Sequence, residues 1–158
     1  MKFSKPIKYW FISICSIIAT AIIGSLVTVK SVNLWYMTLS KPSFDPPNWV
    51  FGPVWTVLYI ILIIVLFSIL NSNKTKHRQK VINIFYLQLF FNALWSVVFF
   101  GFHLIGVALM AIAILWLLIF LCITNANKFS LNSGWLLTPY LLWVSFALIL
   151  NYSIWLLN

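Results

Sequence analysis

The stretch KPSFDPPNWVFGPVWTVLY, residues 41–59, decides how this chain is laid out, because a proline-rich, aromatic segment passes directly into a long apolar run. Pro42, Pro46 and Pro47 fix backbone φ and lack an N–H donor, so they interrupt regular structure. The apolar run continues to about residue 70, and roughly 20 apolar residues are enough to cross a bilayer. The stretch therefore predicts a stiff connector outside the membrane that ends where a spanning helix begins.

The composition of the whole chain predicts a membrane protein. Of its 158 residues, 63% are hydrophobic and 7% are charged, and the mean hydropathy is +1.05. A soluble domain carries about 25% charged residues. We therefore expect an integral membrane protein with one domain over residues 1–158 and no separate soluble module.

Four more apolar runs flank the one that begins in the quoted stretch. The N-terminal run is longer than the apolar core of a typical signal peptide, and no small-x-small cleavage site is evident, so it is interpreted as a retained helix. Polar or glycine-bounded segments separate the remaining runs. The prediction is an all-α bundle of five transmembrane helices, at about 7–28, 49–70, 81–102, 105–125 and 135–157.

The basic residues predict the orientation. Ten Lys and Arg against a single acid, Asp45, give a formal charge of +9, and they lie in short loops, which favours a membrane over a nucleic-acid partner. Cytoplasmic loops carry an excess of Lys and Arg. The N-terminus is therefore predicted to be cytoplasmic, and the C-terminus and the proline-rich connector to lie outside the cell membrane. This orientation leaves Lys30 and Lys41 outside and places on the inner side Lys2, Lys5, Lys8, Lys74, Lys76, Arg78, Lys80 and Lys128.

The apolar runs lack the side chains that several function classes require. No Asp, Glu, Lys, Arg or His lies deep in any of them, and His77 and His103 fall in predicted loops. Proton-coupled pumps and voltage sensors use ionisable residues inside the membrane, so the sequence argues against these classes and against acid–base catalysis there. Cys15 and Cys122 have no CxxC partner, so we expect no disulfide, no metal site and no covalently bound cofactor.

The first predicted span carries a stripe of small residues. Ser16, Thr20, Gly24 and Thr28 recur at steps of four, which places them on one helical face. Small residues let helices approach closely. The stripe is interpreted as packing within the bundle, with a dimer seam as the alternative.

Three predicted spans carry an aromatic or amide face. An amide in hydrocarbon needs a hydrogen-bond partner, so these faces are expected to point into the bundle. One interpretation is that the amides only bridge helices. The other is a cavity lined by aromatic rings and a few convergent amides, which suits a flat, largely apolar ligand. The faces are Phe51, Trp55 and Tyr59; Gln88, Asn92, Trp95 and Phe99; and Pro139, Trp143, Ala147 and Asn151, with Leu150 beside the last.

Three segments, in this order, resemble the TspO/MBR family, which contains the bacterial tryptophan-rich sensory protein and the mitochondrial translocator protein. They are WYMTLSKPSFDPPNWVFGPVWTVLY (35–59), QLFFNALWSVVFF (88–100) and PYLLWVSFALILNYSIW (139–155). The resemblance runs from about residue 35 to the end of the chain, and the number of spans and the loop lengths agree. The first predicted helix adds little to it.

The resemblance implies a five-helix bundle whose ligand pocket opens toward the proline-rich connector. It implies binding of tetrapyrroles, above all protoporphyrin IX, and of benzodiazepine-type ligands. It also implies light- and oxygen-dependent degradation of protoporphyrin IX, with Trp55 and Trp143 facing the ring, and a homodimer. By position, the pocket residues would be Tyr36, Pro46, Trp55, Gln88, Asn92, Trp95, Trp143, Ala147 and Leu150.

The quoted stretch is then interpreted as a stiff lid over that pocket. Its prolines limit backbone freedom, so less entropy is lost when it closes over a ligand. Tyr36 and Pro46 would form the roof and Trp55 a wall. The alternative is a rigid surface connector that carries interfacial tryptophans.

Two other function classes stay open beside porphyrin degradation. One is a passive porphyrin carrier, and the other is a ligand-sensing scaffold that reports to a partner. The sequence departs from animal members at its end, where a proposed cholesterol motif needs a basic residue after a tyrosine. Tyr152 has none after it, so the resemblance does not extend to sterol handling.

Overall fold

Five long helices form the fold. The computed structural model describes residues 5–73, 75–127 and 134–158. Lys2, Lys74 and Lys128, which enter the charge count above, lie outside these ranges. Five helices are long and apolar enough to cross a membrane, and the described ranges contain no strand, so the all-α, five-span prediction is confirmed. The long helices are α1 (Lys5–Val32), α3 (Phe51–Asn71), α4 (Lys76–Ser96), α5 (Ile105–Ala126) and α7 (Thr138–Leu157).

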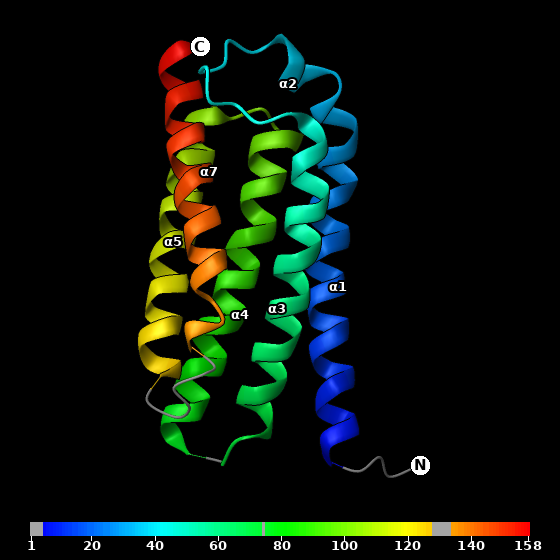
Figure 1. Ribbon diagram of the computed structural model, residues 1–158, viewed down its shortest axis with the longest axis vertical. Helices are drawn as coiled ribbons and strands as arrows, with labels where there is room; N and C mark the ends of the chain where they lie inside the picture. The colour runs from blue at the N-terminus through cyan, green and yellow to red at the C-terminus, as the bar shows by residue number, and fades with distance from the viewer. Residues whose placement is uncertain (1–4, 74, 128–133) are drawn as a thin grey trace.

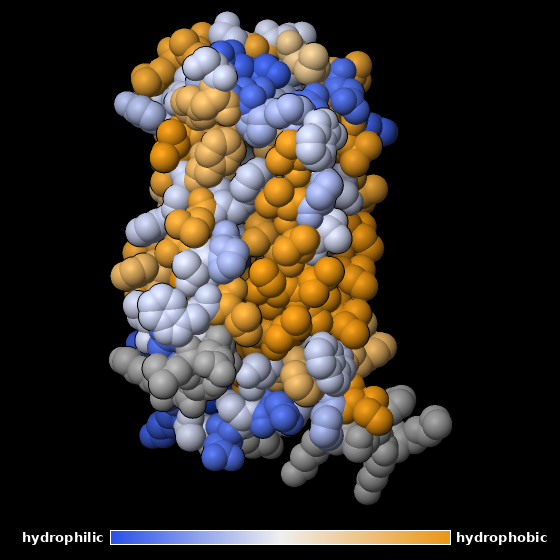
Figure 2. All heavy atoms as spheres, viewed as in Figure 1, coloured by the Kyte–Doolittle hydropathy of each residue, from blue (hydrophilic) through white to orange (hydrophobic). Residues whose placement is uncertain are grey.

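The long helices run side by side along the longest dimension of the molecule (Figure 1). The N-terminus and the turn between α3 and α4 lie at one end, and the short helix α2 (Trp35–Thr38) and the C-terminus lie at the other, which we call the α2 end. Hydrophilic residues gather at both ends, with a hydrophobic face between them (Figure 2). Large apolar side chains on the long helices, such as Phe11 and Leu142, are exposed, as expected of a surface in contact with lipid.

Helix α4 begins at Lys76, about five residues before the predicted start at 81. Thr75 caps it by accepting a 3.0 Å hydrogen bond from the Arg78 backbone N–H. The Arg78 side chain then turns into the bundle, where its guanidinium donates to the carbonyls of Ile69 and Leu70 at the end of α3. The basic segment predicted as a loop is thus partly helical, because its arginine satisfies the last carbonyls of the preceding helix.

A short π-helix, η2 (Val97–Gly101), ends the third span. The Phe102 N–H bonds to the Val97 carbonyl at 2.9 Å, and His103 has a positive φ of 59°. Single π-turns within α-helices are often found at functional sites. Here the turn brings the Phe99 and Phe100 rings within 4.8 Å of each other, beside Trp95.

The small-residue stripe of α1 packs inside the bundle. A Cβ at Gly24 would lie 3.3 Å from the Ser96 hydroxyl, so α1 and α4 approach closely there. About two turns closer to the start of α1, Ser16 and Tyr86 of α4 share a 3.2 Å hydrogen bond. These contacts agree with the packing interpretation of the stripe.

Candidate ligand-binding cavity

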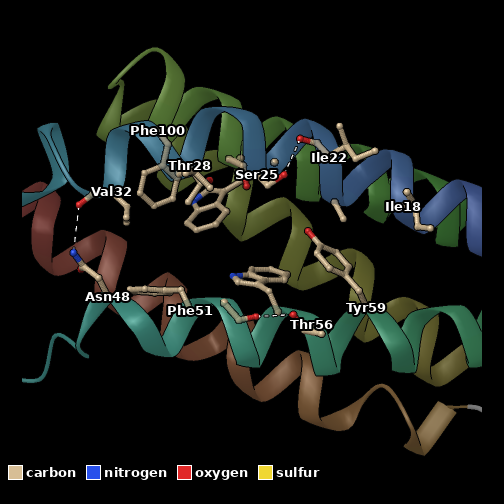
Figure 3. Close-up of a pocket in the computed structure, with 17 residues that line it drawn as sticks. Ile18, Ile22, Ser25, Thr28, Val32, Asn48, Phe51, Thr56, Tyr59 and Phe100 are labelled. Carbon is tan, nitrogen blue, oxygen red and sulfur yellow. Dashed lines mark hydrogen bonds between the residues drawn. The ribbon is translucent and has the colours of Figure 1, made fainter.

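A cavity of about 470 Å³ lies between α1, α3 and the end of α4 (Figure 3). Helix α1 contributes small and aliphatic side chains, and α3 with its preceding turn η1 (Asn48–Val50) contributes aromatic and small ones. None of the lining side chains carries a charge at neutral pH. They are Ile18, Ala21, Ile22, Gly24, Ser25, Thr28, Val29, Val32, Asn48, Phe51, Gly52, Trp55, Thr56, Tyr59, Trp95, Ser96 and Phe100.

Trp55 is the centre of the aromatic wall. Its ring centroid lies 5.5 Å from that of Tyr59, one turn further along α3, and 6.5 Å from that of Trp95 on α4. The Trp95 indole N–H donates to Asn151 Oδ1 at 3.1 Å, so its polar edge is satisfied within the bundle. The wall therefore offers the cavity mainly apolar aromatic surface.

Asp45, the single acid of the chain, fastens the proline-rich connector over the α2 end. Its carboxylate accepts a hydrogen bond from the Tyr36 hydroxyl and pairs with Lys41 Nζ at 3.1 Å. The Lys41 ammonium also lies 4.6 Å from the centroid of the Tyr36 ring. Burial raises the pKa of the Tyr36 phenol far above its ordinary value, and the hydrogen bond to Asp45 and its negative charge add to this. The phenol therefore remains a donor to Asp45.

Two amide side chains tie the connector to neighbouring helices. Asn48 Nδ2 donates to the Val32 carbonyl at 3.4 Å, which joins η1 to the end of α1. Asn158 exchanges two 3.0 Å hydrogen bonds with the Ser40 backbone, which joins the connector to the end of α7. The connector is thus a fixed cover at the α2 end, and its closing over a ligand stays a prediction.

Comparison with known proteins agrees with this architecture. Residues 11–156 match the TspO/MBR family. The chain belongs to that family, as its motifs indicated. The tryptophan-rich protein TspO of Archaeoglobus fulgidus is 43% identical over 151 residues, 92% of this chain and 94% of that protein. The tryptophan-rich sensory protein of Cereibacter sphaeroides is 33% identical over 94% of this chain and 89% of its own length. The human translocator protein is 30% identical, over 77% and 73%.

Two of the nine pocket residues predicted for this TspO/MBR protein line the cavity, Trp55 and Trp95. Tyr36 and Pro46 lie in or beside the connector that covers the α2 end. The Tyr36 ring is buried and contacts two rings of the cavity lining, Phe51 at 6.4 Å and Phe100 at 5.9 Å between centroids. Pro46 is half-buried. These two residues therefore belong to the cover and not to the wall.

Gln88 and Asn92 lie behind the aromatic wall in a chain of hydrogen bonds that joins α3, α4 and α7. The Tyr59 hydroxyl donates to Asn92 Oδ1 at 3.3 Å, and Asn92 Nδ2 donates to the Tyr140 hydroxyl at 2.8 Å. Tyr140 in turn donates to Gln88 Oε1 at 3.0 Å. Both amides thus bridge helices, as one of the two interpretations predicts, and Tyr59 connects their chain to the cavity.

Trp143, Ala147 and Leu150 of α7 do not line the cavity. The Trp143 ring meets the cavity residue Phe51 edge to face, with 6.1 Å between centroids, so the Phe51 ring lies between Trp143 and the cavity. Ala147 and Leu150 are buried in the core. In the described part of the chain, Trp143 Nε1 and Gln88 Nε2 are buried without a hydrogen-bond partner. Unsatisfied buried donors cost about 1–3 kcal/mol each, so these two atoms lower the stability of the bundle beside the cavity.

Sequence reasoning missed the contribution of α1 to the cavity and the role of Tyr140. Helix α1 supplies almost half of the lining, yet its stripe of small residues was interpreted only as packing. The available signal was that Gly24 and Thr28 of the stripe, with Ser25 beside them, are small and leave unfilled space. Tyr140 gave no signal, because a single tyrosine in an apolar run does not reveal that two amides on another helix face it.

Proposed function

We propose that this TspO/MBR protein binds a tetrapyrrole, protoporphyrin IX, inside the membrane and promotes its light- and oxygen-dependent degradation. The observation that carries the proposal is an uncharged cavity among the spanning helices with a wall of Trp55, Tyr59 and Trp95. Small-molecule sites usually measure about 300–1,000 Å³ and are mostly apolar, with a few polar groups that fix orientation. A flat, polarisable ring matches such a wall, and benzodiazepine-type ligands are proposed on the same ground.

The position of Trp55 in the cavity wall supports the proposed photochemistry. Indole offers a large face for offset stacking, which contributes roughly 0.5–1.5 kcal/mol beyond the burial of area. Dioxygen would be the oxidant that degrades the porphyrin under light, and the electron-rich indole of Trp55, which lines the cavity, would donate an electron to the excited ring and recover it as the ring is oxidised. Trp143 would act through its contact with Phe51, or directly where a ligand displaces that ring. Light and oxygen would drive this chemistry without an acid or base in the cavity wall.

The proposal is tested with the purified full chain in detergent or nanodiscs. Protoporphyrin IX is added, and absorbance and fluorescence are followed in the dark and under illumination in air. We expect saturable binding in the dark and a light-dependent loss of the Soret band that differs in rate and products from that of porphyrin free in the same detergent. Identical decay with and without protein would rule out assisted degradation, and absence of saturable binding would rule out the ligand.

A passive carrier is the second candidate, and a ligand sensor the third. Relatives are named translocator protein and tryptophan-rich sensory protein. A carrier would move protoporphyrin IX across liposomes in the dark, whereas a sensor would leave it in place and change the binding of a partner. The covered α2 end and the absence of a charged lining residue favour retention of an apolar ligand over passage to water.

We also propose that the protein is a homodimer in the cell membrane, with the N-terminus in the cytoplasm and the α2 end outside. Most basic residues described in the structure lie at the end where the N-terminus and the α3–α4 turn are found (Figure 1). An excess of Lys and Arg favours the cytoplasmic side. Chemical cross-linking in native membranes would test the dimer, since a monomer would give no band at twice the mass.

The orientation makes a simple labelling prediction. In a background with Cys15→Ser and Cys122→Ser, Ser43→Cys should react with a membrane-impermeant thiol reagent in intact cells, because the connector lies outside. Lys76→Cys should react only after the cells are opened. Both positions are exposed, so accessibility to solvent does not separate them. The reverse pattern would overturn the orientation.

A further inference from the structure

The cavity opens along the seam between α1 and α3. On the α1 side of the opening, Ile22 and Val29 are 51% and 64% exposed, and on the α3 side Gly52 and Thr56 are exposed. The opposite wall, formed by Trp95, Ser96 and Phe100, is 7–8% exposed. The hollow therefore deepens from the outer surface of two spanning helices toward α4, with α1 and α3 on its two sides (Figure 3).

This seam is closed toward both ends of the bundle and open where the cavity lies, along residues 18–32 of α1 and 51–59 of α3. Toward the N-terminal end, the rings of Trp10 on α1 and Phe67 on α3 stack with 4.1 Å between centroids and an angle of 15°. At the α2 end, the Asn48 amide bridges to the Val32 carbonyl, as the dashed line in Figure 3 marks. Among described residues between these two contacts, no hydrogen bond joins α1 to α3. We call the opening between the Trp10–Phe67 stack and the Asn48–Val32 hydrogen bond the α1–α3 window.

The rim of this window suits hydrocarbon. Two hydroxyl residues of the lining on α1 and α3, Ser25 and Thr56, are exposed, and each is bonded within its own helix. Ser25 Oγ donates to the Ile22 carbonyl at 3.1 Å, and Thr56 Oγ1 donates to the Gly52 carbonyl at 2.9 Å. Polar groups that face lipid must be satisfied internally, because no water replaces the missing partner. The rim meets this condition, so an apolar molecule can pass it without stripping water from a polar group.

We propose that the α1–α3 window is the entrance through which a ligand reaches the cavity directly from the hydrocarbon of the bilayer. The proposal rests on the proposed ligand binding and narrows its ligand class to flat molecules that dissolve in the membrane. Entry from water at the α2 end would require breaking the Asn48 bridge or the Tyr36–Asp45–Lys41 cluster. Entry through the window breaks none of these contacts.

Gly52 and Thr56 allow the window to be narrowed without disturbing the core. A Cβ built on Gly52 meets no atom within 4 Å, so a side chain there extends into open space at the rim. Thr56 lies one turn further along α3 and is exposed. We therefore choose the double variant Gly52→Phe/Thr56→Phe. The matched control is Val57→Phe, because Val57 is 57% exposed on the same helix and does not line the cavity.

The first measurement needs no porphyrin. A small phenyl-diazirine probe is dissolved in liposomes that contain the full-length protein, activated by light, and located by mass spectrometry. We expect labelling of the buried Trp95–Phe100 wall in the wild type and in Val57→Phe, and a decrease of at least fivefold in the double variant. Circular dichroism checks that all three proteins fold alike. An unlabelled wall in the wild type, or equal labelling in all three proteins, would overturn the window.

The second measurement follows protoporphyrin IX binding to the same proteins in nanodiscs by stopped flow. We expect association and dissociation both to slow by tenfold or more in the double variant and to stay within threefold of the wild type in Val57→Phe, because the rim controls passage in both directions. Weaker Kd with unchanged association would place these residues in contact with the bound ligand and overturn the entrance. Wall labelling without porphyrin binding would refute the proposed ligand and leave the window as the entrance for another membrane-dissolved molecule.

Discussion

Replacing Trp55 by Phe is expected to slow light-driven loss of bound protoporphyrin IX by about tenfold or more, while dark binding weakens by less than about tenfold. Phe keeps an aromatic face, and stacking by a ring of this kind is worth only about 0.5–1.5 kcal/mol beyond burial. The reaction with light depends instead on the electron-rich indole, which Phe lacks. Trp55 lines the cavity, so its indole would contact a porphyrin bound there. Binding and photochemistry should therefore separate in this variant.

Trp143→Phe tests whether a tryptophan just outside the cavity lining contributes to the light-driven loss of porphyrin. Trp143 lies behind Phe51, with 6.1 Å between their centroids, so we expect its loss to slow degradation less than the loss of Trp55. The control is Trp135→Phe, since Trp135 is 65% exposed and does not line the cavity. The Soret band of each saturated protein is followed in air under constant illumination. Equal decay in all variants and in free porphyrin would remove a specific role for these tryptophans and favour a carrier or a sensor.

Among single substitutions at the end of the bundle where the N-terminus lies, Arg78→Met should cause the largest loss of stability. Arg78 is 8% exposed, and its guanidinium donates to the Ile69 and Leu70 carbonyls at the end of α3. Hydrogen bonds to charged groups contribute about 1.5–3 kcal/mol each, so losing two should cost about 3 kcal/mol or more. Methionine keeps much of the side-chain length, so the loss is mainly that of the two bonds.

Lys80→Met is the matched control for Arg78→Met. It removes the same charge from the same helix, but Lys80 is exposed, so its effect on stability should be small. Thermal unfolding in detergent, followed by circular dichroism or by retention of a single gel-filtration peak, compares the three proteins. If both variants lost the same stability, net charge and not the cap on α3 would be responsible.

Together these variants separate two parts of the molecule. Arg78 holds the N-terminal end of the bundle and lies far along the helices from the cavity, at the opposite end from α2 (Figure 1). Its replacement should lower stability while porphyrin affinity of the folded fraction is kept. Trp55 lines the cavity, so its replacement should change the photochemistry with little loss of stability.

Span number and approximate position followed from the sequence because they depend on local properties. An apolar run of sufficient length crosses a bilayer whatever surrounds it, and the helix ends that differ from the prediction, such as the start of α4, change boundaries and not the fold. Thr75 and Arg78 show the cause at α4, where a side-chain cap and a buried guanidinium drew a basic segment into the helix. The family also followed from the sequence, because its motifs are continuous stretches.

The location of the cavity was decided only by the tertiary structure. Helical spacing showed that Gln88, Asn92 and Trp95 share a face, but it does not say which helix covers that face. In the folded chain Tyr140 of α7 fills the space beside the two amides, while α1 leaves a hollow beside Trp55 and Trp95. Whether inward-facing residues bridge helices or line a cavity depends on the volumes of side chains that are distant in sequence, and only their packing fixes that outcome.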